Sequence, residues 1–210
     1  MKEYPSIDRV VRNEVIYAFD KLDGQNLRVE WNKKQKFHKY GSRRQLISKA
    51  QGRKEDGPYR WSEAIDRVHV KYEKELHDIF VKARFQKAVA FFEFHGPSSF
   101  AGRHVDEELD VTLIDVRVHQ KGLLLPRDYL KMVGDLDIAK LLYHGKANSE
   151  FVEEVRENRL EGMTFEGVVC KAQEYVQPGN PLMFKVKSKA WLYKLVEFCH
   201  GDSTLFEDLK

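Results

Sequence analysis

The sequence predicts a single α+β domain of mostly antiparallel sheets flanked by helices. Six short segments rich in β-branched and aromatic residues are typical of strands: residues 15–19, 27–31, 87–94, 111–118, 164–171 and 182–186. One long helical pattern separates the second of these segments from the third. Strands and helices do not alternate regularly as they do in βαβ units, which favours an α+β arrangement over a parallel α/β sheet.

Turn residues and apolar spacing define the elements in chain order. The first predicted strand is followed by an Asp23-Gly24 turn, after which the second strand begins. Residues 62–84 are predicted to be helical, starting from Ser62 or Asp56, because apolar side chains recur there at three- and four-residue steps. Shorter helices are predicted at residues 127–133, 138–143, 149–158 and 191–199.

No segment of the chain suggests a membrane span, secretion or a second domain. No apolar run in the 210 residues approaches the length of a membrane span, and the start of the chain lacks the apolar core of a signal peptide. Cys170 and Cys199 belong to no CxxC or zinc-type spacing, so we interpret both as reduced structural residues. We therefore expect one domain, residues 1–210, in a cytoplasmic monomer without a membrane partner.

Positive charge is concentrated in one segment, although the net charge is only +3. Residues 28–60 contain eleven Lys or Arg and three Asp or Glu, with Trp31, Phe37, Tyr40 and Tyr59 interleaved. Cations neutralise phosphates and aromatic faces stack on bases, so this composition suits a nucleic-acid surface. An ordinary solvated hairpin carrying lysines explains the same composition equally well.

A lysine at the end of a strand is the first candidate catalytic residue. Lys21 follows the first predicted strand and comes just before the Asp23-Gly24 turn, which would hold its amine in a cleft. A lysine attacks a phosphorus or carbonyl centre only when it is neutral, so nearby cations or partial desolvation must lower its pKa. Taken alone, this pattern is more often a hairpin turn that happens to contain a lysine.

Two glutamates lie in otherwise apolar segments. Burial of Glu93 without a partner would cost several kcal/mol, about 2–7 for a polar group, so it should face a ligand, a cation or water. It could accept hydrogen bonds from ribose hydroxyls, or it could simply point outward by strand alternation. Glu166 precedes Gly167, which permits a close backbone approach, and its hard carboxylate suits Mg²⁺.

Two lysines near the end of the last predicted strand complete the set of candidates. Strand alternation places Lys185 and Lys187 on one face, where they could grip phosphate oxygens from two points. The spacing of two lysines is by itself a very weak motif.

The order of these four groups along the chain carries more information than any one of them. The segments KLDG at residues 21–24, FEFHG at 92–96, EGVV at 166–169 and KVKS at 185–188 resemble motifs I, III, IV and V of the covalent nucleotidyltransferases. That superfamily comprises ATP-dependent DNA ligases, RNA ligases and mRNA capping enzymes. The resemblance spans nearly the whole chain and implies a nucleotidyltransferase (ATP-grasp-like) fold with the nucleotide cleft between the sheets.

Three further positions bear on the choice within that superfamily. Asn26 stands five residues after Lys21, where nick-sealing RNA ligases have asparagine and DNA ligases usually have arginine. Arg43 occupies the place of the arginine of motif Ia, which would contact the donor phosphate or the nucleic acid. Ile114 stands where the family usually has an aromatic residue, so an aliphatic face is expected to pack against the adenine.

The resemblance implies a three-step reaction. Lys21 would take AMP from ATP, pass it to a 5′-phosphate end of RNA, and a 3′-hydroxyl would then seal the strand. Lys185, Lys187 and Mg²⁺ or Mn²⁺ beside Glu166 would stabilise the developing charge and help keep Lys21 neutral. Asp23 and Glu93 would bind the nucleotide, and Asn26 and Arg43 would act in the joining steps.

The implied partner is RNA with 5′-phosphate and 3′-hydroxyl ends, including nicked duplexes and strands that contain DNA. Too few residues follow residue 188 for an OB-fold or a helical carboxy-terminal domain, so we expect a minimal ligase or a separated catalytic domain. A DNA ligase or a GTP-using capping enzyme is an alternative. A non-catalytic nucleic-acid-binding module that uses residues 28–60 is a more distant one.

Overall fold

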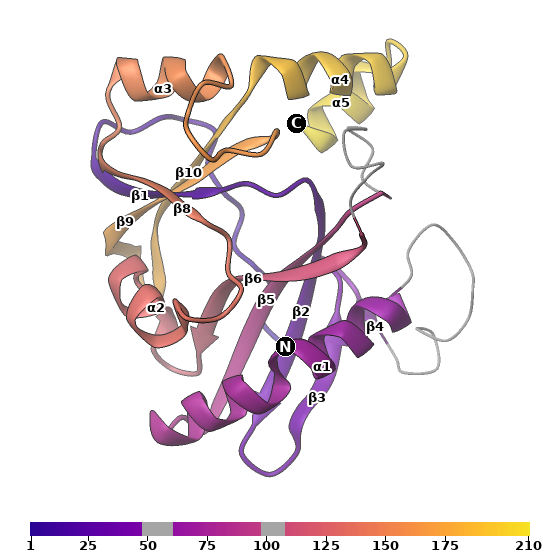
Figure 1. Cartoon of the computed structure of the whole chain (residues 1–210), viewed down its shortest axis with the longest axis vertical. Helices are drawn as coiled ribbons and strands as arrows, with labels where there is room; N and C mark the ends of the chain where they lie inside the picture. Colours follow the sequence, from indigo (N-terminus) through magenta and orange to yellow (C-terminus); the bar gives the residue numbers. More distant parts are fainter. Residues whose placement is uncertain (48–60, 98–107) are drawn as a thin grey trace.

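The strands of the protein form two antiparallel sheets, with helices packed against them. The computed structural model describes residues 1–47, 61–97 and 108–210, and within these residues one sheet has six strands and the other has four (Figure 1). Strands pair in antiparallel ladders in both sheets, and the helices follow no βαβ alternation. The predicted α+β class is therefore confirmed.

The larger sheet is covered on one face by the longest helix. In spatial order its strands are β4 (Leu46–Ile47), β3 (Lys36–Gly41), β2 (Gly24–Asn32), β5 (Lys87–His95), β6 (Asp110–Val118) and β7 (Gly122–Leu123). Helix α1 (Trp61–Lys82) buries Val68, Tyr72, Leu76 and Phe80 against this sheet. The short helix α2 (Pro126–Val133) adds Tyr129 to the same core.

The smaller sheet carries the remaining helices. In spatial order its strands are β10 (Asn180–Lys187), β9 (Gly167–Gln177), β1 (Val15–Asp20) and β8 (Leu141–Lys146). Helix α3 (Ser149–Arg156) packs Phe151 and Val155 against Ile16 and Phe184 of the sheet. Helices α4 (Lys189–Cys199) and α5 (Ser203–Leu209) follow β10 and contact each other.

The chain passes from one sheet to the other at the position of the predicted nucleophile. Strand β1 belongs to the smaller sheet and β2 to the larger one, and only residues 21–23 separate them. Figure 1 shows the two strands running on from each other between the sheets. A side chain at this crossing can therefore meet groups from both sheets.

The sheets also touch at the opposite end, through main chain. A Cβ atom added to Gly122 would lie 2.1 Å from the Cα of Gly179 in the β9–β10 turn. The backbone amide of Leu123 donates to the Gly179 carbonyl at 2.9 Å, and Arg117 donates to Asn180 beside it. Both glycines have positive φ, which a residue with a side chain adopts only with strain.

Some sequence predictions of local structure were wrong. Residues 138–143 are not helical, because Leu141–Lys146 pairs with β1 as strand β8. The strand predicted for residues 164–171 begins only at Gly167, since the backbone amide of Thr164 donates to the Asp20 carboxylate instead of joining the sheet. The prediction missed the short strands β3, β4 and β7 and helix α5. Helix α1 begins one residue before Ser62, and Asp56 lies outside the described residues.

The aromatic residues of the basic segment belong to the hydrophobic core. Trp31, Phe37 and Tyr40 are each at most 3% exposed and pack beneath helix α1. Tyr59 lies outside the described residues. The expectation that these rings present base-stacking faces is therefore wrong for the three that the structure places.

Both cysteines are buried and reduced, as predicted. Cys170 lies in β9 and Cys199 at the end of α4, and neither forms a disulfide. Burial raises the pKa of both thiols. In the described part of the chain, no helix combines the length and the apolar character needed to cross a membrane.

Candidate functional site

Lys21 is held in place by its backbone and presents its amine to a buried carboxylate. Its backbone amide donates to the carbonyl of Gly167 at 2.9 Å, which ties the end of β1 to the start of β9. The side-chain amine lies 2.8 Å from Oε2 of Glu166, and the Lys21 side chain remains 21% exposed. The amine is thus fixed in a site that solvent still reaches.

Glu166 pairs with two lysines at once. Its Oε1 lies 2.7 Å from the amine of Lys187, while Oε2 contacts Lys21. Burial alone would raise the pKa of Glu166, but the two ammonium groups outweigh burial and lower it below the ordinary value. The two cations thus offset the cost of burying this carboxylate.

A glycine lets the Glu166 segment approach the neighbouring strand. Gly167 has a φ of +136°, and a Cβ atom there would lie 2.1 Å from the Val186 carbonyl oxygen. Ser188 fixes the same segment from the other side, because its backbone amide donates to the Glu166 carbonyl at 2.9 Å. The predicted close approach at Gly167 is confirmed, and it is made to the strand that carries Lys187.

The two strand lysines face the same site, as alternation predicts. Lys187 also lies over the ring of Trp191, 3.4 Å from the ring centroid. Burial and the nearby Lys21 lower the pKa of Lys187 to about 8, although Glu166 opposes the shift. Burial together with Lys187 and Lys21 lowers the pKa of Lys185 to about 7, and its amine donates to the main-chain oxygen of Lys210 at 2.9 Å.

Glu93 lies on the larger sheet, near Lys21. It pairs in register with Asn26 on β2 and with Thr112 on β6. Burial raises the pKa of Glu93 to about 8, with Lys21 opposing the shift and Glu166 adding to it. The alternative that Glu93 simply points into solvent is wrong, because it lies within the electrostatic reach of Lys21 and Glu166.

Asn26 and Asp23 lie beside these charged groups. The amide of Asn26 donates to the Phe92 carbonyl at 3.4 Å, a long contact that leaves the side chain weakly held. Asp23 is buried between β1 and β2, and its charge raises the pKa values of Lys21 and Glu93. Both side chains therefore belong to the same cluster as Lys21.

Arg43 and Ile114 are less closely joined to the cluster. Arg43 is exposed in the segment between β3 and β4, and its positive charge lowers the pKa of Glu93. Ile114 is half-buried in β6 and packs between the core beneath α1 and a smaller apolar cluster that includes Tyr4 and Phe91. Arg43 thus lies within electrostatic reach of Glu93, and Ile114 lies in β6, the strand that pairs with β5.

The Lys21 amine itself is more strongly protonated than expected. Burial would lower its pKa, but the carboxylates of Glu166 and Glu93 outweigh burial and raise it above the ordinary lysine value. The expectation that neighbouring cations keep Lys21 neutral is therefore wrong for this state, because the nearest partner of Lys21 is an anion. The contact with Glu166 therefore disfavours the neutral form of the amine.

Sequence reasoning missed a buried network next to the site. Lys171 is 3% exposed, and its amine contacts Oδ2 of Asp115 at 2.8 Å and the Ile114 carbonyl at 3.1 Å. The Tyr4 hydroxyl donates to the same Asp115 oxygen at 3.1 Å. The signal was a lysine that closes an apolar run, Gly167-Val168-Val169-Cys170-Lys171, since such a charge must have a buried partner.

Asp20 was also missed, although it directly precedes Lys21. Its Oδ1 accepts hydrogen bonds from the backbone amide of Thr164 at 3.1 Å and from the Thr164 hydroxyl at 3.3 Å. Burial raises the pKa of Asp20, and the Thr164 hydrogen bonds oppose the shift. This carboxylate holds the segment leading to Glu166 against the strand that carries Lys21.

The oxygen donors suit a divalent cation only in part. No group of three His, Cys, Asp or Glu side chains within residues 1–47, 61–97 and 108–210 is arranged to hold a metal ion. Mg²⁺ commonly binds through one or two carboxylates together with substrate phosphates and water. Glu166, with the Glu93 carboxyl group nearby, fits such a shared site and does not form a complete metal cage.

Comparison with known proteins shows the fold. The sequence matches no family model and no curated protein. The structure is similar to an RNA ligase from Naegleria gruberi determined with pyrophosphate, with a TM-score of 0.59 and 18% identity over 87% of this chain. Variants of that ligase determined with ATP and Mn and with AMP and Mn give TM-scores of 0.61 and 0.63, at 16% and 15% identity over 91% and 92% of this chain.

The likeness covers part of each of those ligases. This chain spans 52%, 59% and 58% of the three ligase chains. At this low identity, the comparison establishes the fold. The activity must be inferred from the residues of the site. The protein shares its α+β fold with these RNA ligases.

Proposed function

We propose that this protein is an ATP-dependent RNA ligase, or the catalytic domain of one, in which Lys21 forms a lysyl–AMP intermediate. One observation carries the proposal. Lys21, Glu166 and Lys187 come from separate parts of the chain and meet within 2.8 Å contacts. Exposed ion pairs contribute about 0–1 kcal/mol to stability, whereas buried charges are costly and cluster at functional sites.

The first step is adenylyl transfer to Lys21. The neutral Nζ attacks the α-phosphorus of ATP, an N–P bond forms, and the P–O bond to pyrophosphate breaks. One proton leaves the nitrogen for solvent. The positive charges of Lys185 and Lys187 stabilise the charge that grows on the phosphate oxygens and on pyrophosphate.

Deprotonation of Lys21 is coupled to nucleotide binding in this scheme. The Glu166 carboxylate keeps the amine protonated while the two are paired. A divalent cation bound with the phosphates at Glu166 would supply Lewis-acid stabilisation of the phosphate charge. When Glu166 turns away from Lys21, the amine loses the partner that favours its charged form.

The remaining steps use groups around the rim of the site. An oxygen of the terminal 5′-phosphate of RNA attacks the AMP phosphorus, so a P–O bond forms and the N–P bond to Lys21 breaks. The 3′-hydroxyl then attacks the phosphorus of that 5′-phosphate, loses its proton to solvent, forms the phosphodiester bond and releases AMP. Glu93 and Asp23 are assigned to nucleotide binding, with Glu93 on the ribose hydroxyls. Asn26 and Arg43 are assigned to the joining steps.

The pocket for the base is assigned to β6. The aliphatic face of Ile114 would pack against the adenine, between the two apolar clusters that it already joins. Residues 1–210 are taken to act as one catalytic domain.

Covalent labelling tests the proposal directly. The purified protein is incubated with radiolabelled ATP, GTP or NAD and with Mg²⁺ or Mn²⁺, and mass spectrometry locates the nucleotide on the peptide that contains Lys21. We expect an AMP adduct from ATP, its loss in Lys21→Ala and Lys21→Arg, and its retention in Lys74→Ala, which alters an exposed lysine on α1.

Two results would contradict the proposal. Labelling by GTP alone would identify a guanylyltransferase, and an adduct that persists in Lys21→Ala would mean that another residue is the nucleophile. Sealing of a nicked duplex with RNA or DNA on each side of the nick then distinguishes RNA ligation from DNA ligation.

A further inference from the structure

The end of the larger sheet farthest from Lys21 is densely positive. The hairpin between β2 and β3 carries Lys33, Lys34 and Lys36, all exposed. Within the described residues, no carboxylate lies at ion-pair distance from these three lysines. Arg84 and Lys121 are also exposed, in the adjoining connections before β5 and after β6.

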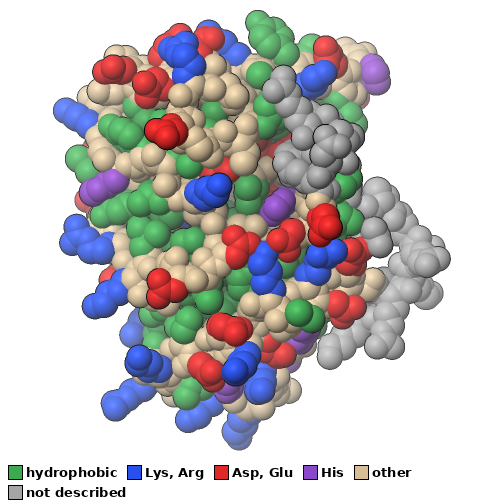
Figure 2. Space-filling model, in the orientation of Figure 1, with side chains coloured by type: hydrophobic (Ala, Val, Ile, Leu, Met, Phe, Trp, Pro, Cys, Tyr) green, Lys and Arg blue, Asp and Glu red, His purple; other side chains and the backbone are tan. Residues whose placement is uncertain are grey.

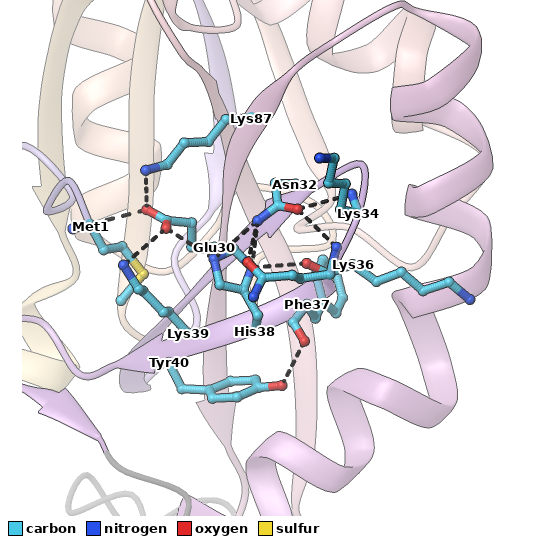
Figure 3. A network of polar contacts seen from close by, with 11 residues as sticks. Met1, Glu30, Asn32, Lys34, Lys36, Phe37, His38, Lys39, Tyr40 and Lys87 are labelled. Carbon is cyan, nitrogen blue, oxygen red and sulfur yellow. Dashed lines mark hydrogen bonds and ion pairs between the residues drawn. The ribbon is translucent and has the colours of Figure 1, made fainter.

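A single buried carboxylate organises the cations beside this hairpin (Figure 3). Glu30 is 1% exposed, and its oxygens lie 2.9 Å from the amine of Lys87, 3.6 Å from that of Lys39 and 3.3 Å from Nε2 of His38. The amino group of Met1 lies 4.0 Å from it. Lys39 and Lys87 remain 55% and 42% exposed, so they are held in position while their charge stays available.

We call the exposed lysines of this hairpin and its two neighbouring strands the basic end: Lys33, Lys34, Lys36, Lys39 and Lys87. Figure 2 shows Lys and Arg side chains projecting around the lower end of the molecule, where the β2–β3 hairpin lies in Figure 1. Glu30 pairs with several cations there, and Glu73 accepts from the Phe37 amide at 3.3 Å, so the five lysines still outnumber these two carboxylates. The whole chain has a net charge of only +3, so this concentration of positive charge is local.

The chemistry of the basic end selects phosphates rather than bases. Trp31, Phe37 and Tyr40 of this segment are buried in the core, so they offer no stacking surface. Ammonium groups bind phosphate oxygens and release counterions, and they do so regardless of base sequence. The surface therefore fits the phosphodiester backbone of a nucleic acid.

Strands β2 and β5 link the basic end to the site, and the side chains between the two places on this face, Arg28, Val89 and Phe91, are buried. Along β2, Asn26 and Glu30 are separated by an even number of residues, and so are Glu93 and Lys87 along β5, where pairing is regular. Strand β2 covers about 25–30 Å at about 3.3 Å per residue. A polyanion that reaches both places must extend over that length.

We propose that the basic end holds the phosphodiester backbone of the RNA substrate at a point about 25–30 Å from Lys21. The identity of the partner as RNA rests on the proposed function. The contact increases the affinity for RNA and orients it, and it does not depend on the base sequence of the RNA. At about 3.4 Å per step of a B-form helix, a duplex arm must extend about eight base pairs from the joined end to gain it, and an A-form RNA arm, which rises less per step, needs a few more.

Removal of the charge tests this surface. The basic variant carries Lys33→Ala, Lys34→Ala and Lys36→Ala, at exposed turn positions. The matched control carries Lys74→Ala, Lys131→Ala and Lys146→Ala, which remove the same charge from exposed positions elsewhere. Binding of fluorescent nicked duplexes, with arms of about four or about sixteen base pairs on either side of the nick, is measured by anisotropy at several salt concentrations.

We expect the basic variant to bind the long-arm duplex at least about tenfold more weakly, with a salt slope lower by about 2 to 3. Short-arm binding should be unchanged, and the control should match the wild type for both duplexes. Equal binding by the basic variant and the wild type would overturn the inference, and so would an equal loss in the control. The inference would also be overturned if the basic variant lost only the binding of phosphatidylserine vesicles, because that result would assign the surface to a membrane.

The AMP adduct separates this inference from the proposed function. Adduct formation on Lys21 needs no RNA, so the basic variant should form it at the wild-type rate. If the wild type forms the adduct and the basic variant binds RNA as well as the wild type does, only this inference fails. If the wild type forms no adduct with ATP, the proposed function fails whatever the binding shows.

Discussion

At the scale of single residues, the site is a balance of charge around Glu166. Lys21 and Lys187 both pair with the Glu166 carboxylate, so neither lysine has it as an exclusive partner. The three lysines respond differently to this neighbourhood. The pKa of Lys21 rises through its contact with Glu166, whereas burial and mutual repulsion lower the pKa values of Lys185 and Lys187 to about 7 and about 8.

These opposite shifts predict the pH dependence of adduct formation. The neutral fraction of Lys21 grows about tenfold per pH unit, while the charged fraction of Lys185 falls above about 7 and that of Lys187 above about 8. We expect kcat/KM for ATP to rise up to about pH 7, to level off, and to fall above about pH 8. Initial rates of AMP incorporation at limiting ATP measure the profile.

Lys187→Arg provides the control for this profile, because a guanidinium stays charged throughout the range. The decline above about pH 8 should become shallower in this variant. An unchanged decline would mean that deprotonation of Lys187 does not cause the loss of activity at high pH.

The residues of this balance were foreseeable from the sequence, but its electrostatics were not. Lys21, Glu166 and Lys187 stand in recognisable motifs, so their convergence could be predicted. The protonation of Lys21 depends on which group lies 2.8 Å from its amine, and no spacing in the sequence encodes that. Lys171 and Asp115 were missed because their pairing joins β9 to β6, 56 positions apart.

At the scale of elements, helix α4 is tied to the site by its N-cap residue, Ser188. The hydroxyl of Ser188 donates to the Phe165 carbonyl at 2.7 Å and accepts from the Trp191 amide at 3.1 Å. Ser188 thereby caps α4 and holds the residue before Glu166. Trp191, in the first turn of the helix, lies against the Lys187 amine.

Loss of this cap should affect both stability and chemistry. We expect Ser188→Ala to lower the free energy of unfolding by about 1–3 kcal/mol, because it removes the cap and the hydrogen bond from the Ser188 hydroxyl to the Phe165 carbonyl. The rate of AMP incorporation should fall too, since Glu166 loses support. Urea denaturation and adduct kinetics measure the two effects.

Asn148→Ala is the matched control. Asn148 caps α3 through the Phe151 amide at 2.9 Å, away from Lys21. Its loss should cost about 1 kcal/mol and leave adduct formation unchanged. If both variants slow the chemistry equally, Ser188 acts only through stability.

Elements with a strong local pattern were predictable, and those defined by a partner were not. Helix α1 shows regular apolar spacing, so its residues were recognised from that spacing. Residues 138–143 show a helix-like pattern, yet β1 has an open edge that Leu141–Lys146 fills by hydrogen bonding. Tertiary pairing outweighs weak propensity in such short segments.

At the scale of the whole molecule, the two sheets are joined at both ends of the domain. Residues 21–23 join them at the site, and the Gly122–Gly179 contact joins them at the far end. The second junction is a contact between main-chain atoms, so no side chain there can move to relieve a clash. The geometry of the site therefore depends on a contact remote from it.

A pair of glycine variants isolates this junction. We expect Gly122→Ala to lower the free energy of unfolding by about 1–3 kcal/mol more than Gly201→Ala does. Both glycines have positive φ, so both variants pay the strain of about 1–2 kcal/mol, but a Cβ at Gly201 meets nothing within 4 Å. Thermal and denaturant unfolding of the two variants gives the comparison. Equal destabilisation would show that the sheets separate there without cost.

The fold class was predictable at this scale, whereas the junction was not. The run of strands without βαβ alternation is visible in the sequence. The meeting of Gly122 with Gly179 depends on how two turns, 57 residues apart, come together.

The burial of both cysteines makes the protein convenient to label. Cys170 and Cys199 are 0% and 5% exposed, and burial keeps their thiols protonated, so maleimides should react with them slowly. A single cysteine introduced at the exposed Lys33 would then carry a fluorophore alone, with no need to remove the native thiols. Such a probe reports contacts at the hairpin in the otherwise unaltered chain.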